Sequence, residues 1–305
     1  MQSAFTLPSF AKINWTLRIL GRRKDGFHEL FTVFQTISLH DTIAFAEHDS
    51  LELTCDDPTM STADDNFIIK ATKALRERAG IDDGAVIHLV KRIPSPGGLG
   101  GGSSNAAVAL IGLKKLWKLN ISDDELSAIA ADIGSDAPFF LHGGTAIGTG
   151  RGEIIERIGD IEEQFMLIVT PNVQVSTRNA FERINAATLT NEASNRILRV
   201  CRSEADSLSL PHSVLINDFE AGIFFAYPEV QRVKETLLVL GAVNAAMIGS
   251  GASVFAVFDK EETRQAALKA LDREITWRKF AVATISRDEY REALLGAQVV
   301  SDQFL

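Results

Sequence analysis

The stretch PSPGGLGGGSSN, residues 94–105, combines bare backbone and hydroxyl groups in a way that could bind an anion. Five glycines fall in the six positions from Gly97 to Gly102, and Ser103 and Ser104 follow directly. Glycine inside a regular element costs about 0.5–1 kcal/mol relative to alanine. Five together therefore indicate that side chains would obstruct something there, and a closely bound ligand is the leading explanation.

The flanking sequence favours a phosphate-like ligand. Residues 85–93, AVIHLVKRI, have the apolar content of a strand, and residues 103–119 have the apolar spacing of a helix. A helix that follows a glycine loop presents amides without an intrahelical partner and a partial charge of about +0.5. We predict a phosphate-binding loop with a helix beginning at Ser103 or Ser104; a hinge or tight turn is the alternative. The loop fits neither G-x-x-x-x-G-K-[ST] nor G-x-G-x-x-G.

A lysine and an aspartate, far apart in the chain, could supply charge and acid–base chemistry. In AKINWTLRIL, residues 11–20, apolar and polar residues alternate, so Lys12 and Asn14 share one face of a predicted strand. Asp136 follows a Gly-Ser turn and precedes Pro138, a position typical of the cap of a short helix. From the pattern alone, a solvated lysine and a capping aspartate are the simpler interpretations.

The elements that must position these residues predict an α+β fold. Helical and strand patterns intermix without regular βαβ alternation. DDNFIIKATKALRERAG predicts a helix that is capped by Asp65 or Asn66 and ends at Gly80, and Ser122 with Glu125 predicts a capping box. A second unit begins near residue 160, which gives two domains, 1–159 and 160–305.

Composition limits the function classes. The 305 residues are 46% hydrophobic and carry a formal net charge of -9, which disfavours a nucleic-acid polymer or an anionic membrane surface as partner. No apolar stretch approaches the length of a membrane span. Cys55 and Cys201 stand alone, without a disulfide or zinc pattern. We therefore expect a cytoplasmic protein with a small-molecule partner. A monomer or weak homodimer is the expected state, although composition does not decide between them.

Four segments carry a resemblance to a known family. The glycine stretch resembles the phosphate loop of the GHMP kinases, P-x-x-x-G-L-G/S-S-S-x-A. The segments FAKINWTLRILGRRKDGFHELFTVFQTISLHD, IGSDAPFFLHGGTAIGTGRGE and MIGSGASVFAVF resemble the branch that phosphorylates a cytidine diphosphate derivative of methylerythritol. The four occur in the family's order between residues 10 and 258 and cover most of the chain. Phe27 stands where this branch usually has tyrosine.

The resemblance implies a fold and a reaction. The fold is the two-domain GHMP kinase fold, with an N-terminal ribosomal-S5-like α/β domain and a C-terminal ferredoxin-like α+β domain. The reaction transfers phosphate from ATP, with Mg²⁺ as a further cofactor, to the substrate's 2-hydroxyl in non-mevalonate isoprenoid precursor biosynthesis. Lys12 and Asp136 are the implied catalytic residues: Asp136 orients the hydroxyl and takes its proton late, and Lys12 neutralises charge on the transferring group.

The resemblance also assigns binding residues. Those for ATP are Pro94, Ser95, Pro96, Gly97, Gly98, Leu99, Gly100, Gly101, Gly102, Ser103, Ser104 and Asn66. Those for the substrate are Asn14, Phe27, His28, Thr177, Phe181, Gly249, Ser250 and Gly251. Thr177 and Phe181 are four apart and so share one face of a predicted helix. No carboxylate stands out as a magnesium ligand, so ATP itself and a serine are expected to provide most of the ion's ligands.

Three alternatives remain open at the level of sequence. The first is another GHMP kinase, of the homoserine or mevalonate type, against which the segment DGFHEL argues. The second is a non-catalytic nucleotide-binding relative, against which the retention of Lys12 and Asp136 argues. The third is a phosphate-loop hydrolase, which would consume ATP without an acceptor.

Overall fold

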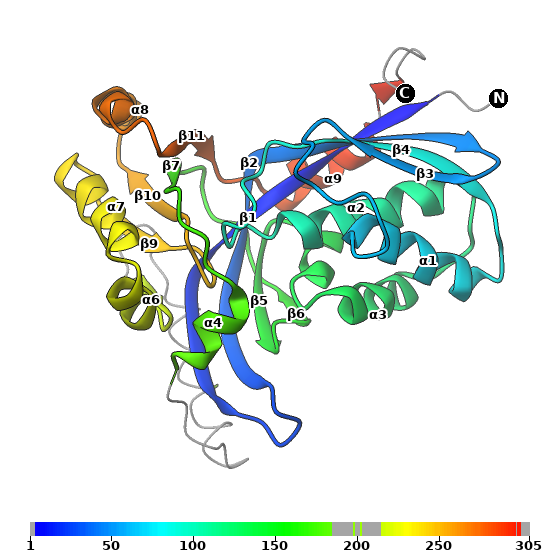
Figure 1. The fold of residues 1–305 in the computed structure, drawn as a ribbon, viewed down its shortest axis with the longest axis horizontal. Helices are drawn as coiled ribbons and strands as arrows, with labels where there is room; N and C mark the ends of the chain where they lie inside the picture. The colour runs from blue at the N-terminus through cyan, green and yellow to red at the C-terminus, as the bar shows by residue number, and fades with distance from the viewer. Residues whose placement is uncertain (1–3, 185–197, 199–201, 203–214, 297, 300–305) are drawn as a thin grey trace.

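The computed structural model describes residues 4–184, 198, 202, 215–296 and 298–299, and two sheets organise them (Figure 1). Within these residues the larger sheet has eight strands, built around the long antiparallel pair β1 and β2 in the order β12-β1-β2-β4-β3, with β5 also on β2, β6 on β5 and β8 on β1. Its strands are β1 (Phe5–Arg22), β2 (His28–His48), β3 (Leu51–Cys55), β4 (Gly84–Val90), β5 (Thr145–Gly150), β6 (Ile154–Arg157), β8 (Ile216–Asn217) and β12 (Gln298–Val299).

Helices pack on one side of the larger sheet and enclose a hydrophobic core (Figure 1). They are α1 (Phe67–Ala79), α2 (Gly101–Leu116), α3 (Asp123–Ile133) and the 3-10 helix η1 (Ala137–Leu141). Two predicted caps are confirmed: the Asn66 side chain accepts the Ile68 amide at 2.8 Å, and Ser122 and Glu125 form a capping box. These caps satisfy amides that have no partner inside the helix.

Helix α2 begins at Gly101, two residues before the predicted start at Ser103. The chain turns into the helix at Gly100, whose φ of 73° lies in the left-handed region. The Ser104 amide then donates to the Gly100 carbonyl at 2.8 Å. Glycine has low helix propensity, which is why the prediction excluded these residues, but tertiary packing overrides that propensity here.

The second sheet has the arrangement that the resemblance implied. It consists of β7 (Phe165–Thr170), β9 (Asn244–Met247), β10 (Val254–Phe258) and β11 (Arg278–Ala283), in the order β11-β7-β10-β9. All three pairings are antiparallel. When the four strands are numbered in chain order, their order across the sheet is fourth, first, third, second. Helices follow the first and third strands, which completes the ferredoxin-like pattern. The helices are α6 (Glu220–Ala226), α7 (Pro228–Val239) and α8 (Glu261–Ala270), and the 3-10 helix η2 (Leu271–Arg273) follows α8.

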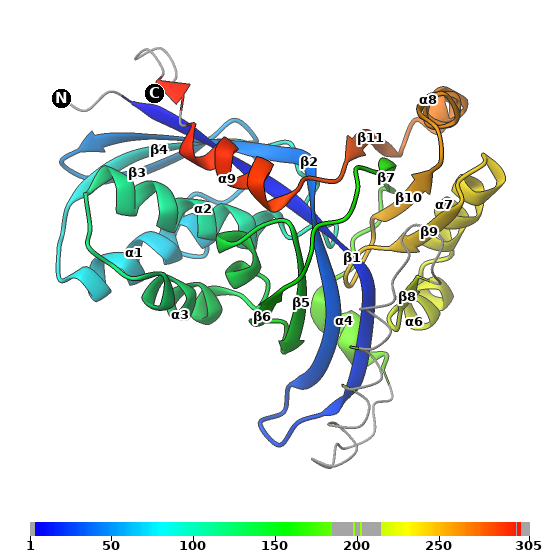
Figure 2. The same ribbon diagram turned by 180° about the vertical axis from the view of Figure 1, so that it is seen from behind.

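The end of the described chain returns to the larger sheet. Helix α9 (Arg287–Leu295) runs beside β1, and β12 pairs with the beginning of β1 (Figure 2). The division at residues 159 and 160 stays a prediction, because these returning elements pack on the first unit. Short helix α4 (Thr177–Glu182) follows β7.

Two further sequence features have a place in the structure. In the described ranges, no helix has both the length and the apolar character that crossing a membrane requires. Cys55 is a half-buried free thiol, and burial raises its pKa. Cys201 lies outside the described residues.

Candidate active site

A cavity of about 370 Å³ gathers segments that are far apart in the chain. They are β1, β2, the glycine loop (residues 94–103), the start of η1, α4 and the second glycine turn (residues 249–251). Most of the predicted site residues line it: Lys12, Asn14, Pro94, Ser95, Pro96, Gly97, Gly98, Leu99, Gly100, Gly101, Gly102, Ser103, Asp136, Thr177, Phe181, Gly249, Ser250 and Gly251.

Lys12 and Asp136 meet in this cavity. Lys12 Nζ lies 3.2 Å from Asp136 Oδ2, and the lysine side chain is only 3% exposed. Lys12 is therefore not the solvated strand lysine of the simpler interpretation. Burying an ammonium group is costly unless it is paired. The Phe34 ring is a second partner of this ammonium group, because Lys12 Nζ lies 5.6 Å from the ring centroid, at cation–π distance.

Asp136 occupies the predicted helix cap without acting as one. It is the N-cap residue of η1, yet its side chain caps no backbone amide of that helix. An N-cap side chain accepts from the second or third helical residue, and the second here is Pro138, which has no N–H group. The half-buried carboxylate is consequently available to Lys12 and to a substrate.

A chain of hydrogen bonds fixes Lys12. Its ammonium donates to Asn14 Oδ1 at 2.8 Å, Asn14 Nδ2 donates to Thr32 Oγ1 at 2.7 Å, and Thr32 donates to the Thr16 carbonyl at 2.7 Å. The shared strand face predicted for Lys12 and Asn14 is therefore real, and both side chains are buried. Because Asn14 is committed to Lys12 and Thr32, it orients the ammonium group as well as lining the cavity.

The glycine loop packs tightly against other parts of the protein. A Cβ atom on Gly98 would lie 2.0 Å from the Ile248 carbonyl oxygen, and one on Gly100 would lie 2.8 Å from the Phe140 ring. The Leu99 carbonyl accepts the Lys12 amide at 3.0 Å, and the Gly97 carbonyl accepts the Ser253 amide at 3.3 Å. The obstruction that the glycines avoid is thus the protein itself, so the glycine count alone is no sign of a ligand.

The feature that does indicate an anion is the N-terminus of α2. No side chain of the described residues caps it, and its first residues line the cavity together with Ser103. Uncapped amides at the positive end of a 16-residue helix are suited to binding an anion. The predicted loop–helix arrangement therefore holds, and it opens toward Lys12 and Asp136.

A second cavity of about 730 Å³ adjoins the first, and it is lined by Phe27 and His28, the remaining residues that the sequence analysis assigned to the substrate. Thr177 and Phe181 line both cavities, as expected for one face of α4. The His28 ring stacks on Phe181 with centroids 4.9 Å apart, and Phe27 is 53% exposed. Burial, with a smaller effect of nearby Arg22, lowers the pKa of His28, which favours a neutral ring.

The family assignment follows from comparisons with known proteins. Residues 66–144 match the family described as GHMP kinases N terminal domain, and residues 191–275 match GHMP kinases C terminal. A protein named 4-diphosphocytidyl-2-C-methyl-D-erythritol kinase, from Chlorobium phaeobacteroides, is 42% identical over 86% of this chain and 91% of its own length. The chain belongs to the GHMP kinase family of 4-diphosphocytidyl-2-C-methyl-D-erythritol kinases.

Solved structures place this GHMP kinase in the same fold. One titled 4-(cytidine 5'-diphospho)-2C-methyl-D-erythritol kinase is 29% identical, with a TM-score of 0.73, over 92% of this chain and 98% of its own. Homoserine kinase from Cytophaga hutchinsonii gives a TM-score of 0.70 at 18% identity, over 94% of this chain and 96% of its own, which shows the fold alone. The two-domain α+β GHMP kinase fold expected from the sequence is confirmed.

Two residues assigned to ATP do not line either cavity of this GHMP kinase. Ser104 is fully buried, and its hydroxyl lies 2.8 Å from that of Ser9. The Asn66 side chain is engaged as the cap of α1. The neighbour of Asn66, Phe67, reaches the cavity instead.

Three polar residues of the site escaped the sequence analysis. Thr32 holds Asn14. Asn217 donates to the Met247 and Gly249 carbonyls, both at 2.8 Å, and so fixes the second glycine turn. Arg151 lines both cavities, with its guanidinium carbon 5.0 Å from the centroid of the Phe27 ring. Thr32 and Arg151 had a usable signal, since each lies within a segment that carries the resemblance, whereas Asn217 lies in none of them.

Proposed function

We propose that this chain transfers the γ-phosphoryl group of ATP to the 2-hydroxyl of 4-diphosphocytidyl-2-C-methyl-D-erythritol, as a cytoplasmic enzyme of non-mevalonate isoprenoid precursor biosynthesis. The observation that carries the proposal is the 3.2 Å contact between Lys12 and Asp136 in a cavity that the N-terminus of α2 also lines. The names of the relatives supply the acceptor. A monomer or weak homodimer is the proposed state.

The proposed step needs an oriented hydroxyl and stabilised charge. The acceptor oxygen bonds to the γ-phosphorus, the bond between that phosphorus and the β–γ bridging oxygen breaks, and ADP leaves. The hydroxyl proton passes to Asp136, and Lys12 and the α2 amides stabilise charge on the transferring group. Since Asn14 and Thr32 hold Lys12, its ammonium group needs little rearrangement as the reaction proceeds.

Magnesium fits this site only with ATP as its main ligand. Across the described ranges, His, Cys, Asp and Glu form no group of three or more that could hold a metal. Mg²⁺ keeps several waters and often binds through one or two protein oxygens plus substrate phosphates. Ser103, which lines the cavity, would supply such an oxygen. When bound with ATP, the ion neutralises phosphate charge.

The adjoining cavity is the proposed cytidine site. Phe27 and Phe181 offer aromatic faces for the base, and base–aromatic stacking contributes about 1–3 kcal/mol per base. The neutral His28 ring can donate and accept at the edge of the base. Thr177 and the second glycine turn lie where the two cavities join, since Thr177 lines both and its hydroxyl lies 3.1 Å from that of Ser250.

The acceptor assay separates this function from its alternatives. Purified protein is incubated with ATP and, in separate reactions, 4-diphosphocytidyl-2-C-methyl-D-erythritol, homoserine or mevalonate, and ADP release is measured. We expect turnover with the cytidine compound and none with homoserine or mevalonate. Turnover with homoserine or mevalonate would favour another GHMP activity, ADP release without an acceptor would favour a hydrolase, and no turnover at all would favour a non-catalytic relative.

Arg151→Gln is expected to raise KM for the cytidine acceptor by about 10-fold or more, because a hydrogen bond to a charged group contributes about 1.5–3 kcal/mol. A substrate that spans both cavities would place its diphosphate near Arg151, a cation that lines both. Steady-state kinetics at saturating ATP measures this. Arg157→Gln is the matched control, since Arg157 lies in β6 of the same hairpin and lines neither cavity. Equal KM values for the two variants would contradict the assignment.

A further inference from the structure

Asp41, on β2, lies beside the end of β4, where the chain leaves the larger sheet and continues into the glycine loop. Its cross-strand partner on β1 is Ser9, and the ladder between β2 and β4 begins at the next residue, with Thr42 opposite Val90. Residues 91–93 lie beyond the end of that ladder and connect it to Pro94. Asp41 is fully buried there, and so is the side chain of Ile93.

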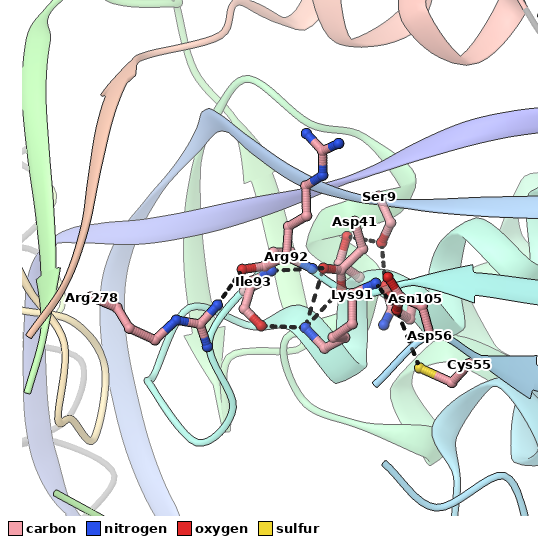
Figure 3. A network of polar contacts seen from close by, with 10 residues as sticks. Ser9, Asp41, Cys55, Asp56, Lys91, Arg92, Ile93, Asn105 and Arg278 are labelled. Carbon is pink, nitrogen blue, oxygen red and sulfur yellow. Dashed lines mark hydrogen bonds and ion pairs between the residues drawn. The ribbon is translucent and has the colours of Figure 1, made fainter. Parts of the chain in front are cut away.

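The Asp41 carboxylate provides acceptors for this connecting segment (Figure 3). One of its oxygens accepts the backbone amides of Arg92 and Ile93, each at 2.7 Å, and the other forms an ion pair with Lys91 Nζ at 2.9 Å. The Lys91 ammonium also donates to the Ile93 carbonyl. Buried backbone amides need an acceptor, and past Val90 the carboxylate takes the place of a strand partner.

Ser9 makes the corresponding contacts at the other end of the loop (Figure 3). Its hydroxyl donates to Asn105 Oδ1 at 2.6 Å and lies 2.8 Å from Ser104 Oγ. Ser104 and Asn105 belong to the first turns of α2, and the three side chains are buried. A single cross-strand pair, Ser9 and Asp41, therefore holds the segments on both sides of the glycine loop.

The held segments lie directly against the first turn of α2. A Cβ atom on Gly101 would lie 3.1 Å from Ile93 Cγ2 and 3.4 Å from Lys91 Nζ. A buried ion pair is weak support for stability by itself, because desolvation offsets the attraction between the charges. The burial of the Asp41–Lys91 pair is explained if the pair serves to orient the amides of Gly101 and its neighbours.

We propose that Ser9 and Asp41 form a clamp that fixes both ends of the glycine loop, and that Asp41 is a positioning residue for the triphosphate. This inference rests on the proposed function, in which the α2 amides bind ATP. Neither clamp residue lines the cavity. The clamp acts through the loop, so its loss changes ATP binding more than acceptor binding.

The test compares Asp41→Asn and Ser9→Ala with wild type in the acceptor assay, well below each protein's melting temperature. Asp41→Asn removes the charge that Lys91 faces, and Ser9→Ala removes the hydroxyl at the other end. For each variant we expect KM for ATP to rise by about 10-fold, with KM for the acceptor within about twofold. Asp160→Asn is the matched control, because Asp160 likewise accepts two backbone amides, those of Thr145 and Arg287, away from the loop. It should leave both KM values unchanged.

The outcomes separate the clamp from the proposed function. If wild type turns over the acceptor and the variants have a lower melting temperature but an unchanged KM for ATP, Asp41 and Ser9 are merely structural and the clamp is wrong. If Asp41→Asn does not fold, Ser9→Ala alone decides in the same way. A wild-type chain without ATP turnover would overturn the proposed function and the clamp together.

Discussion

Asp136→Asn is expected to lower kcat by about 10²–10⁴ while KM for ATP stays within a few-fold of wild type. The amide keeps the shape of the carboxylate but cannot accept the proton of the acceptor hydroxyl. Lys12 remains held by Asn14 at 2.8 Å, so the charge that faces the transferring group stays in place. ADP release under saturating acceptor and ATP measures the effect.

Asp132→Asn is the control for this result. Asp132 lies four residues earlier, is exposed near the end of α3 and lines neither cavity, so its kinetics should match wild type. A circular-dichroism melt of both variants excludes unfolding as the cause of lost turnover. If Asp136→Asn turns over at the wild-type rate, Asp136 is not the proton acceptor, and the 3.2 Å contact only stabilises Lys12.

The sequence predicted best what local patterns decide. Alternation in residues 11–20 placed Lys12 and Asn14 on one strand face, and capping rules located the ends of α1 and α3. Periodicity could not show that the polar face of β1 is buried, because burial depends on segments that pack from elsewhere. The meeting of Lys12 with Asp136, residues on separate elements, came from the resemblance and not from spacing.

The parts that were missed are long-range contacts. Asn217 acts through carbonyl groups of residues 247 and 249, and nothing around it in the sequence indicates that partnership. Ser104 belongs to the loop motif, yet in the fold its hydroxyl turns toward Ser9 on β1. The glycines point to a ligand in local reasoning because the groups that they actually approach, such as the Ile248 carbonyl and the Phe140 ring, belong to other parts of the chain.

Gly98→Ala is expected to lower both stability and turnover, because the added Cβ would meet backbone. It would lie 2.0 Å from the Ile248 carbonyl oxygen and 2.9 Å from its carbon, at a φ of 75°. Forcing extra atoms into packed structure costs about 1–3 kcal/mol, and the left-handed conformation adds about 1 kcal/mol for alanine. Since the loop must move away from residue 248, its amides shift relative to Lys12, and a displacement of about 1 Å can lower the rate by about 10²-fold.

Gly80→Ala separates the two contributions to this loss. Gly80 has a similar φ of 66°, but a Cβ there would meet nothing within 4 Å. The control therefore shares the backbone strain without the collision, and we expect a free energy of unfolding about 1 kcal/mol below wild type, with unchanged kcat. Urea denaturation and the acceptor assay measure both quantities. Gly98→Ala could instead lose no more stability than Gly80→Ala and keep its turnover. In that case the contact between the glycine loop and residue 248 does not fix the loop, and other contacts must set the position of the α2 amides.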